Sequence, residues 1–378
     1  MFAFLLIAQQ FSIGIWSALF SAPLPVLLEK SDPSQRIEVL RCLFSTNLVL
    51  IGLAALAFTL LSLGLGATGW TAAAFAVCSG AALLRVVARA HAYSTGAPMR
   101  TVRSDLVYSA AVGCGVLILI LLNPPAVGFF FLVLGVSALV ALMPFGSQYF
   151  LLQFFRFGTG DVAAYSLVWR QHSGWSLTGV ITTELTVNSH AYLVTLLAGP
   201  AAFAPVAASA LLTRPLGVAM NAMTEFERPR MARQIGENRI RDVLRSASGF
   251  RWTLIVIWIM TAISVPAVAL IAPGILFAPQ YDANVLAAGL ALWMAVTAVR
   301  LMRLPESVLL QAAGCFRGLA MASILSACIS VVAVALLILV GGPVWSIAGI
   351  LIGEAACGFG IWRQARRWRS TIGGGVSQ

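Results

Sequence analysis

The sequence predicts an all-α polytopic membrane protein built from two pseudo-repeated helical lobes. Three observations carry this prediction: an apolar composition, a series of membrane-length apolar runs, and an alternation of basic and non-basic loops. Of the 378 residues, 60% are hydrophobic and 10% are charged, and the mean hydropathy is +0.93. Soluble proteins carry about 25% charged residues. The composition therefore excludes an ordinary soluble protein and favours repeated bilayer-spanning segments.

Eleven apolar runs are long enough to cross a bilayer, which takes about 20 helical residues. Charged residues and clusters of proline and glycine separate them. The runs cover approximately residues 1–28, 43–64, 71–93, 104–122, 126–147, 173–197, 201–222, 251–272, 284–304, 318–340 and 344–362. We expect each run to form one membrane-spanning helix.

The basic residues alternate from loop to loop along the chain. Lysine and arginine total 24 against 13 acidic residues, a net charge of +11, and Lys30 is the single lysine. Every second loop, together with the C-terminal tail, holds 21 of these 24 basic residues if the helix-end arginines are included. The loops between them hold no lysine or arginine, and Asp282 is their only charge. The positive-inside rule therefore places the basic loops and the C-terminus in the cytoplasm.

A short repeat indicates that the chain has two related halves. Residues 38–41 read Glu-Val-Leu-Arg and residues 242–245 read Asp-Val-Leu-Arg, and each tetrapeptide leads from a long cytoplasmic loop into an apolar helix. In the same register, Arg85 and Arg89 near the end of the third span correspond to Arg300 and Arg303 near the end of the ninth. Two similar halves around a central pathway are typical of a transporter.

This register divides the chain into an N-terminal lobe of five spans (1–147), an interfacial linker (148–172), a C-terminal lobe of six spans (173–362) and a basic cytoplasmic tail (363–378). The sixth span then has no partner in the first half, and the first span begins on the outer side. We therefore expect a plan of two six-helix lobes from which the first helix is missing. Residues 1–28 lack the basic start of a signal peptide and are expected to be a true span.

Several classes of function find no support in the residue pattern. Nucleic-acid binding needs a soluble basic domain, and no polar stretch of the sequence exceeds about 30 residues. The sequence contains no C-x-x-C pair, no H-E-x-x-H and no phosphate-binding G-x-x-x-x-G-K-[ST] motif, so we expect no metal, no cofactor and no catalytic residues. The six cysteines are expected to be apolar fillers, and the three histidines packing residues, although one histidine could carry a proton.

Four ionisable residues fall deep within predicted spans, where a charge is costly and indicates function. With a rise of 1.5 Å per residue, Glu184 lies about 16 Å from the cytoplasmic start of its helix and Arg214 about 13 Å from the cytoplasmic end of the next. The same arithmetic puts Arg85 and Glu354 each at about 12 Å. We expect these residues to form a polar belt near the middle of the membrane.

Two interpretations of the belt remain open. Glu184 and Arg214 could pair only to tolerate burial or to register two helices. Alternatively, the arginines could line a water-filled cavity and bind an anionic group, because the guanidinium fork suits phosphate or diphosphate. Arg251, Arg300, Arg303 and Arg363 lie close enough to helix ends to extend to the interface, and we expect them to do so.

The helices around the belt carry further signals. Glu184 and Asn188 are four residues apart, so they share one helix face, which we expect to face the interior rather than lipid. Pro205 and Pro215 predict a bend in the next helix close to Arg214. The charged loop 223–250 is predicted to form an amphipathic helix on the inner leaflet, where it could contact lipid headgroups.

Loose motifs distributed along the chain resemble those of a known transporter family. They are Glu184, Asn188, Leu197-Ala198-Gly199-Pro200, Ala207-Ala208-Ser209-Ala210, Arg214-Pro215, Arg228-Pro229-Arg230, Tyr281, Gln311-Ala312-Ala313-Gly314, Arg317, Trp345-Ser346-Ile347-Ala348-Gly349, and the segment from Arg85 to Asp105. Together they resemble the Wzx-type polysaccharide flippases of the multidrug/oligosaccharidyl-lipid/polysaccharide exporter superfamily, over most of the chain.

The resemblance implies twelve helices in two lobes and alternating access of a cationic cavity to the two leaflets. It implies a multi-pass protein of the bacterial cytoplasmic (inner) membrane that flips undecaprenyl-diphosphate-linked oligosaccharide outward for O-antigen, capsule or exopolysaccharide assembly. On this basis Arg85, Arg89, Arg214 and Asn188 would bind substrate, and Glu184 and Glu354 would balance charge or couple ions. Membrane lipids, a polysaccharide polymerase and a chain-length regulator are the implied partners.

Three other functions are weighed against this one. A cation-coupled multidrug antiporter of the same superfamily would need an acidic chamber, whereas the predicted belt has at least as many arginines as glutamates. A membrane polymerase or ligase would need a large outer loop with catalytic arginines, and every predicted outer loop is short and free of arginine. A non-catalytic scaffold would leave the belt unexplained. The flippase is therefore the preferred prediction, and the antiporter is the alternative.

Overall fold

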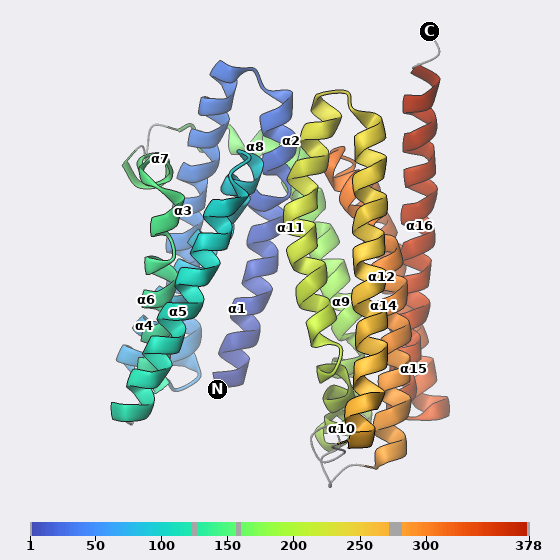
Figure 1. Cartoon of the computed structure of the whole chain (residues 1–378). Helices are drawn as coiled ribbons and strands as arrows, with labels where there is room; N and C mark the ends of the chain where they lie inside the picture. Colours follow the sequence, from blue (N-terminus) through green and yellow to red (C-terminus); the bar gives the residue numbers. More distant parts are fainter. Residues whose placement is uncertain (1, 123–126, 156–159, 272–281, 376–378) are drawn as a thin grey trace. The chain divides into compact units, whose positions relative to one another are not determined.

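The computed structural model describes residues 2–122, 127–155, 160–271 and 282–375, and over these ranges the chain is helical and contains no strand (Figure 1). The chain divides into two compact units, Met1–Leu177 and Thr178–Gln378. The predicted all-α class with two helical lobes is confirmed. Tyr281 and most of the predicted outer loop around it lie outside the described residues, as does the predicted loop 123–125.

The first unit is built on long helices, of which one has a side-chain N-cap and two are followed by glycine turns. Thr68 Oγ1 accepts a hydrogen bond from Thr71 N and caps the fourth helix, while Gly66 and Gly96 adopt positive φ in the turns that follow two of the helices. The central α4 packs against α3 and α6, and α5 packs against α6. The elements are α1 (Phe2–Trp16), η1 (Ser17–Ser21), α2 (Pro23–Lys30), α3 (Pro33–Gly64), α4 (Gly69–Ser94), α5 (Pro98–Leu122) and α6 (Val127–Val140).

Short helical turns follow α6 and belong to the first unit. They are η2 (Met143–Phe145), α7 (Ser147–Phe150), η3 (Leu151–Phe155), α8 (Tyr165–Val168) and η4 (Trp169–Ser173). Tyr149 is fully buried against Phe44 and Phe145, and the Tyr165 hydroxyl donates a 2.9 Å hydrogen bond to the Leu19 carbonyl. Burial raises the pKa of Tyr165 to about 12. Tyr149 and Tyr165 therefore anchor the segment predicted as a linker to the core of this unit.

A chain of buried amide hydrogen bonds joins three elements of the first unit. Trp16 Nε1 donates to Asn47 Oδ1 at 2.9 Å, Asn47 Nδ2 donates to Gln153 Oε1 at 3.1 Å, and Gln153 Nε2 donates to the Phe44 carbonyl at 3.2 Å. Asn47 and Gln153 are fully buried. A polar side chain without a partner would be costly in this apolar surrounding, so these bonds fix how η3 packs against α3 and α1.

The second unit is organised around α14, which packs against α10, α11, α12 and α16. Asp282 caps α14 by accepting a 2.8 Å hydrogen bond from Asn284 N. Helices α15 and α16 pack together through glycines that let the two backbones approach closely. The elements are α9 (Gly174–Ala198), α10 (Pro200–Leu211), α11 (Arg214–Gly236), α12 (Ile240–Ile271), α14 (Ala283–Ala312), α15 (Phe316–Gly341), η5 (Pro343–Trp345) and α16 (Ser346–Gly375).

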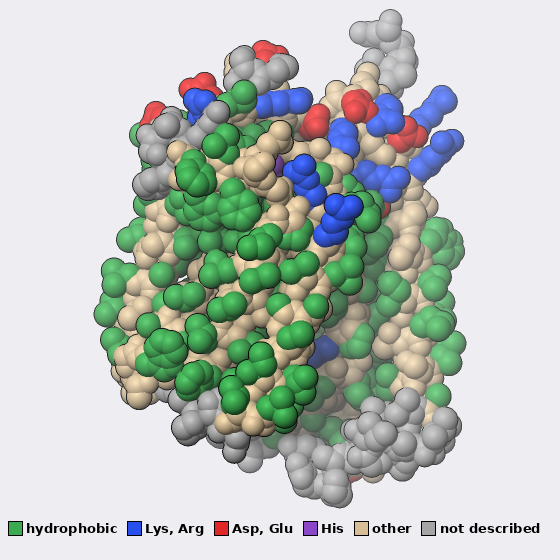
Figure 2. Space-filling model, turned by 60° about the vertical axis from the view of Figure 1, so that its left-hand side comes forward, with side chains coloured by type: hydrophobic (Ala, Val, Ile, Leu, Met, Phe, Trp, Pro, Cys, Tyr) green, Lys and Arg blue, Asp and Glu red, His purple; other side chains and the backbone are tan. Residues whose placement is uncertain are grey.

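Within the described ranges, nine single helices are long and apolar enough to cross a membrane, and a bent pair makes ten. Eleven spans were predicted. The predicted span 173–197 forms the 25-residue α9, about 37 Å long, but its run of threonines with Glu184 and Asn188 makes it less apolar than the others. In Figure 2, Lys and Arg gather above a broad band of hydrophobic side chains, the pattern of a multi-pass membrane protein.

The bent pair confirms the predicted bend near Arg214. Helices α10 and α11 meet at an angle of 55°, and Pro215 lies in the first turn of α11. The prediction for the following segment is wrong. Residues 223–250 form a hairpin of α11 and α12 rather than a surface helix, because α11 buries residues such as Glu227 and Met231, and Asn238 with φ 57° turns the chain.

The predicted internal repeat appears in matching helices of the two units. The tetrapeptides at 38–41 and 242–245 begin five and two residues after the first residues of α3 and α12, and both helices are 32 residues long. Arg85 and Arg89 lie 16 and 20 residues after Gly69, the first residue of α4. Arg300 and Arg303 lie 17 and 20 residues after Ala283, the first residue of α14. The arginine pairs therefore occupy corresponding turns of corresponding helices.

Candidate functional site

The predicted belt residues are divided between the two units. Arg85 and Arg89 lie on α4 of the first unit, and Glu184, Asn188, Arg214 and Glu354 lie on α9, α11 and α16 of the second. In each unit, two arginines of one helix share a carboxylate of a neighbouring helix. We call these the α4–α5 cluster and the α14–α16 cluster.

The α4–α5 cluster consists of Arg85, Arg89 and Asp105, with Ser104 and Tyr108. The two arginines are four residues apart on one face of α4. Arg85 Nη2 lies 2.5 Å from Asp105 Oδ1, Arg89 Nη1 pairs with the same oxygen, and Arg85 Nε donates to Ser104 Oγ at 3.3 Å. The Arg85 guanidinium also lies 4.2 Å from the centre of the Tyr108 ring. Contacts to three side chains of α5 thus fix the orientation of this guanidinium.

Backbone anchoring holds the α5 side of this cluster in place. Ser104 is fully buried, and its hydroxyl donates a 2.6 Å hydrogen bond to the carbonyl of Ala141 beyond the end of α6. Ser104, Asp105 and Tyr108 share one face of α5 by helical spacing, so one anchored hydroxyl positions all three. Asp105 remains 43% exposed, so the cluster is open on its acidic side.

The α14–α16 cluster consists of Arg300, Arg303 and Glu354. Arg300 Nε donates to Glu354 Oε1 at 2.7 Å, and Arg303 approaches Oε2 through both Nε, at 2.8 Å, and Nη2, at 2.7 Å. The Glu354 side chain is 1% exposed. Three bonds to one buried carboxylate compensate for its removal from water, and they hold α14 against α16.

Hydrogen-bonding capacity remains available at Arg300. Its buried Nη2 has no hydrogen-bond partner among the described residues.

The polar face of α9 carries Glu184, Asn188 and His190. Asn188 Nδ2 donates to Glu184 Oε2 at 2.8 Å, as the four-residue spacing allows. His190 is buried, its Nδ1 lies 2.8 Å from the Val187 carbonyl, and its ring meets Trp293 edge-on with centroids 5.3 Å apart. Glu184 is half-buried and forms no ion pair with any described residue.

The predicted ion pair between Glu184 and Arg214 is wrong. Arg214 lies at the first turn of α11, directly after the bend, and its side chain is exposed. It forms no ion pair within the part of the chain that the structure describes. The pairing followed from the shared depth of the two residues in consecutive antiparallel spans, whereas a 55° bend lies directly before Arg214.

The expectation that Arg251, Arg300 and Arg303 extend freely to the interface is also wrong, because all three bind buried carboxylates. Arg251 pairs with Glu306, which also lies 3.4 Å from Arg369 of the C-terminal helix. Sequence reasoning did not identify Asp105 or Glu306 as partners. The sequence did contain one indication of the two clusters, because an arginine pair occurs at corresponding positions of α4 and α14. Two arginines within a span require a countercharge nearby.

In each cluster two guanidinium groups bind one carboxylate. Guanidinium groups suit anions rather than cations. Over the described ranges, no group of three or more His, Cys, Asp or Glu side chains lies together as a metal site would require.

No family model matches the chain, and no curated protein matches it. Solved structures do. A MOP-superfamily transporter from Pyrococcus furiosus aligns with a TM-score of 0.75 at 14% identity, covering 98% of this chain and 86% of the other. A point mutant of the Vibrio cholerae MATE transporter VcmN aligns with a TM-score of 0.75 at 16% identity, covering 98% of this chain and 88% of the other.

A multidrug resistance MATE transporter in its outward-facing conformation gives a TM-score of 0.74 at 13% identity, covering 98% of this chain and 86% of the other. These alignments extend over both units. At these identities the likeness is one of fold. The chain has the two-lobed helical fold of the MOP-superfamily transporters.

Proposed function

We propose that this protein is a transporter that moves an amphiphilic anion, undecaprenyl-diphosphate-linked oligosaccharide, from the inner to the outer leaflet of the bacterial cytoplasmic membrane. The observation that carries the proposal is the pairing of two arginines with one carboxylate in both clusters. Arg85 and Arg89 share Asp105, and Arg300 and Arg303 share Glu354. A membrane protein bears the cost of such cationic groups when an anion uses them.

The chemistry of the clusters suits a diphosphate. Guanidinium groups bind phosphate oxygens in pairs, and a carboxylate that holds two of them side by side orients their remaining N–H groups in advance. Asp105 is 43% exposed, so its arginines can exchange part of their contact with it for a phosphate. Arg300 retains a buried Nη2 without a described partner, which supplies a donor in the second unit.

Alternating access of the two lobes would carry the bound diphosphate between leaflets while the lipid tail stays in the bilayer. The polysaccharide polymerase and chain-length regulator of such a pathway are the partners that this function implies. A cytoplasmic C-terminus follows from the basic character of α16 after Arg363.

The second candidate is a cation-coupled multidrug antiporter, and one observation favours it. Glu184 is a half-buried carboxylate that accepts a hydrogen bond from Asn188 and pairs with no described arginine, so it is available to a proton or a cation. Two of the similar structures are described as MATE transporters. The Pyrococcus furiosus transporter is described as having a binding pocket of reverse polarity that suggests a different function, so pocket charge varies within this fold.

The deciding experiment uses a strain deleted for this gene with its glycan synthesis intact. Undecaprenyl-diphosphate oligosaccharide should accumulate in the inner leaflet, and the wild-type gene should relieve the accumulation. The variant Arg85→Ala/Arg89→Ala should fail to relieve it. Arg103→Ala is the matched control, since it removes an exposed arginine of α5 close to the cluster. Normal surface glycan in the deletion strain, with new sensitivity to lipophilic cations, would favour the antiporter.

A further inference from the structure

The last turns of α16 carry basic residues that no acidic residue of the same segment balances. The sequence contains no Asp or Glu after Glu354, whereas four arginines fall within residues 363–369. They are Arg363, Arg366, Arg367 and Arg369. Arg369 Nη2 lies 3.4 Å from Glu306 Oε1, while the other three are exposed and form no ion pair with a described residue. Four basic residues at the cytoplasmic end of a span favour contact with anionic lipids.

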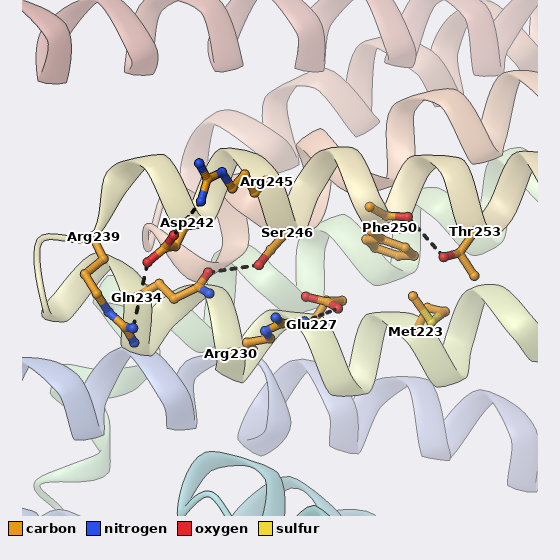
Figure 3. Close-up of a pocket in the computed structure, with 11 residues that line it drawn as sticks. Met223, Glu227, Arg230, Gln234, Arg239, Asp242, Arg245, Ser246, Phe250 and Thr253 are labelled. Carbon is orange, nitrogen blue, oxygen red and sulfur yellow. Dashed lines mark hydrogen bonds and ion pairs between the residues drawn. The ribbon is translucent and has the colours of Figure 1, made fainter.

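The arginines of the α11–α12 hairpin differ, because carboxylates already neutralise them. Both helices line a cavity in which Arg230 pairs with Glu227 (Figure 3). In the same cavity Asp242 lies 3.8 Å from both Arg239 and Arg245. The exposed arginines at the end of α16 lack such carboxylates, so their charge is available to an external anion.

Two of these arginines share one face of α16 with two aromatic residues. Phe359, Trp362, Arg363 and Arg366 are spaced i, i+3, i+4 and i+7, so they lie on one strip of the helix surface. All four side chains are exposed, whereas Ile361 on the opposite face is buried. The strip therefore points away from the helices that pack against α16. We call these four residues the α16 strip.

Each arginine of the α16 strip folds back over an aromatic ring one turn earlier. The Arg366 guanidinium lies 4.5 Å from the centre of the Trp362 ring, and that of Arg363 lies 5.9 Å from the centre of the Phe359 ring. Helical side chains point toward the N-terminus of their helix, which explains this direction. Stacking uses the flat face of a guanidinium, so the N–H groups at its edge stay free to bind phosphate oxygens.

Two exposed tryptophans place the α16 strip at a membrane interface. Trp345, directly before α16, is 52% exposed, and Trp362 is 45% exposed. Trp362 follows 17 residues later, about 25 Å along a helix, which is close to the roughly 30 Å of the hydrocarbon core. Exposed tryptophans are typical of the two interfaces, and the positive-inside rule makes the arginine-bearing one cytoplasmic. The guanidinium groups that fold back toward Trp362 thus lie at the level of the inner headgroups.

We propose that the α16 strip binds an anionic phospholipid of the inner leaflet, such as phosphatidylglycerol. Arg363 and Arg366 are three residues apart, and at this spacing Cβ atoms lie about 5–6 Å from each other. Both guanidinium groups can therefore donate to one phosphate. Phe359 and Trp362 pack against the upper part of the acyl chains. A choline headgroup fits less well, because its quaternary ammonium is repelled by the same arginines.

The proposal does not rest on the proposed function, because no residue of the α16 strip belongs to either arginine cluster. Its test is a binding measurement on the purified full chain in detergent micelles. Native mass spectrometry compares phosphatidylglycerol with phosphatidylcholine of identical acyl chains. One basic residue beside an anionic lipid corresponds to about fivefold in affinity, so phosphatidylglycerol should bind at least about fivefold more tightly.

A pair of matched variants tests the arginines. Arg363→Gln/Arg366→Gln changes two exposed side chains without an ion pair, so the fold should stay intact and the preference for phosphatidylglycerol should disappear. Arg103→Gln/Arg241→Gln is the control. It removes the same charge from exposed positions of α5 and α12, and it should leave the preference unchanged.

A third variant tests the aromatic rings of the α16 strip. Phe359→Leu/Trp362→Leu keeps both arginines and an apolar surface but removes the ring faces on which the guanidinium groups stack. The preference for phosphatidylglycerol should fall about twofold to fivefold. A basic helix end that acted through its net charge alone would keep its full preference in this variant.

Several results would overturn the proposal. Equal binding of the two lipids by the wild type would show that no headgroup is recognised. An equal loss of preference in Arg103→Gln/Arg241→Gln would assign it to the overall charge of the cytoplasmic side, and an unchanged preference in Arg363→Gln/Arg366→Gln would place the site elsewhere. Displacement of phosphatidylglycerol by millimolar inorganic phosphate would assign the α16 strip to free phosphate.

Discussion

Arg303 holds Glu354 through two nitrogens, with Nη2 at 2.7 Å and Nε at 2.8 Å from Oε2, inside a helix pair where the carboxylate is 1% exposed. Arg300 binds the remaining oxygen, Oε1, at 2.7 Å. Both oxygens of the Glu354 carboxylate therefore accept hydrogen bonds from arginines. Two guanidinium groups and one carboxylate together carry one net positive charge. The α4–α5 cluster repeats this ratio with a more exposed carboxylate, so the same charge count occurs in two different environments.

Replacement of Glu354 should destabilise the second unit strongly. Glu354→Gln leaves Arg300 and Arg303 partly buried without a countercharge, and loss of one member of a buried ion pair costs about 3–5 kcal/mol. The midpoint of thermal denaturation in detergent should fall well below that of the wild type. Glu237→Gln, which alters a half-exposed surface pair, is the control. Equal midpoints for the two variants would contradict the structural role of Glu354.

Replacement of Asp105 should affect stability less. Asp105 is 43% exposed, so water can replace part of its contact, but Arg85 and Arg89 are only 15% and 20% exposed and lose their countercharge. Asp105→Asn should therefore denature between Glu354→Gln and the wild type, and it makes the cluster more positive. Under the proposed function, complementation should be altered without loss of folded protein. A denaturation midpoint as low as that of Glu354→Gln would show that Asp105 is as structurally important as Glu354.

Glu184 separates the two candidate functions. In Glu184→Gln the side-chain oxygen can still accept the hydrogen bond from Asn188, so stability should stay within about 1 kcal/mol of the wild type. The ionisable group, however, is lost. An antiporter that couples through this carboxylate should lose the dependence of its transport on proton or sodium gradients, measured in proteoliposomes. Retained gradient dependence in this variant would exclude Glu184 as the coupling group.

A charge exchange between α9 and α11 should give no rescue. Arg214 is exposed and forms no ion pair with a described residue, so Glu184→Arg and Arg214→Glu act at independent sites. The effects of independent substitutions add to within about 0.5 kcal/mol. The double variant should therefore be at least as defective in complementation as the worse single variant. Recovery in the double variant would show that the two residues meet in another state of the transport cycle.

Close packing of α15 and α16 depends on Gly349. A Cβ atom at this position would lie 2.5 Å from the backbone nitrogen of Val334 and 2.6 Å from its Cα, so Gly349→Ala must force the helices apart. We expect a loss of stability of about 1–3 kcal/mol. Gly358→Ala on the same helix meets its nearest atom at 3.7 Å and should be neutral or stabilising. Thermal denaturation of both variants in detergent measures the difference.

The helical fold and its repeat could be predicted because they depend on patterns that are local in sequence. Apolar run length alone determines which segments can span a bilayer, since every backbone hydrogen bond of a helix is satisfied within the segment. The matched tetrapeptides at 38–41 and 242–245 led correctly to two helices of equal length. Pro205 and Pro215 led correctly to the bend between α10 and α11, because a proline in a helix removes a backbone donor.

The partners of the charged side chains were decided only by the tertiary structure. Asp105 lies 16 and 20 residues from Arg89 and Arg85, and Glu354 lies 51 and 54 residues from Arg303 and Arg300. Whether such residues meet depends on helix rotation and packing, which single-helix periodicity does not specify. Arg214 is exposed because the chain bends directly after α10. Residues 223–250 were predicted to form a surface helix, but they form a hairpin in which Glu227 is buried. The sequence alone thus determined the helical segments, and packing between helices determined which charges meet.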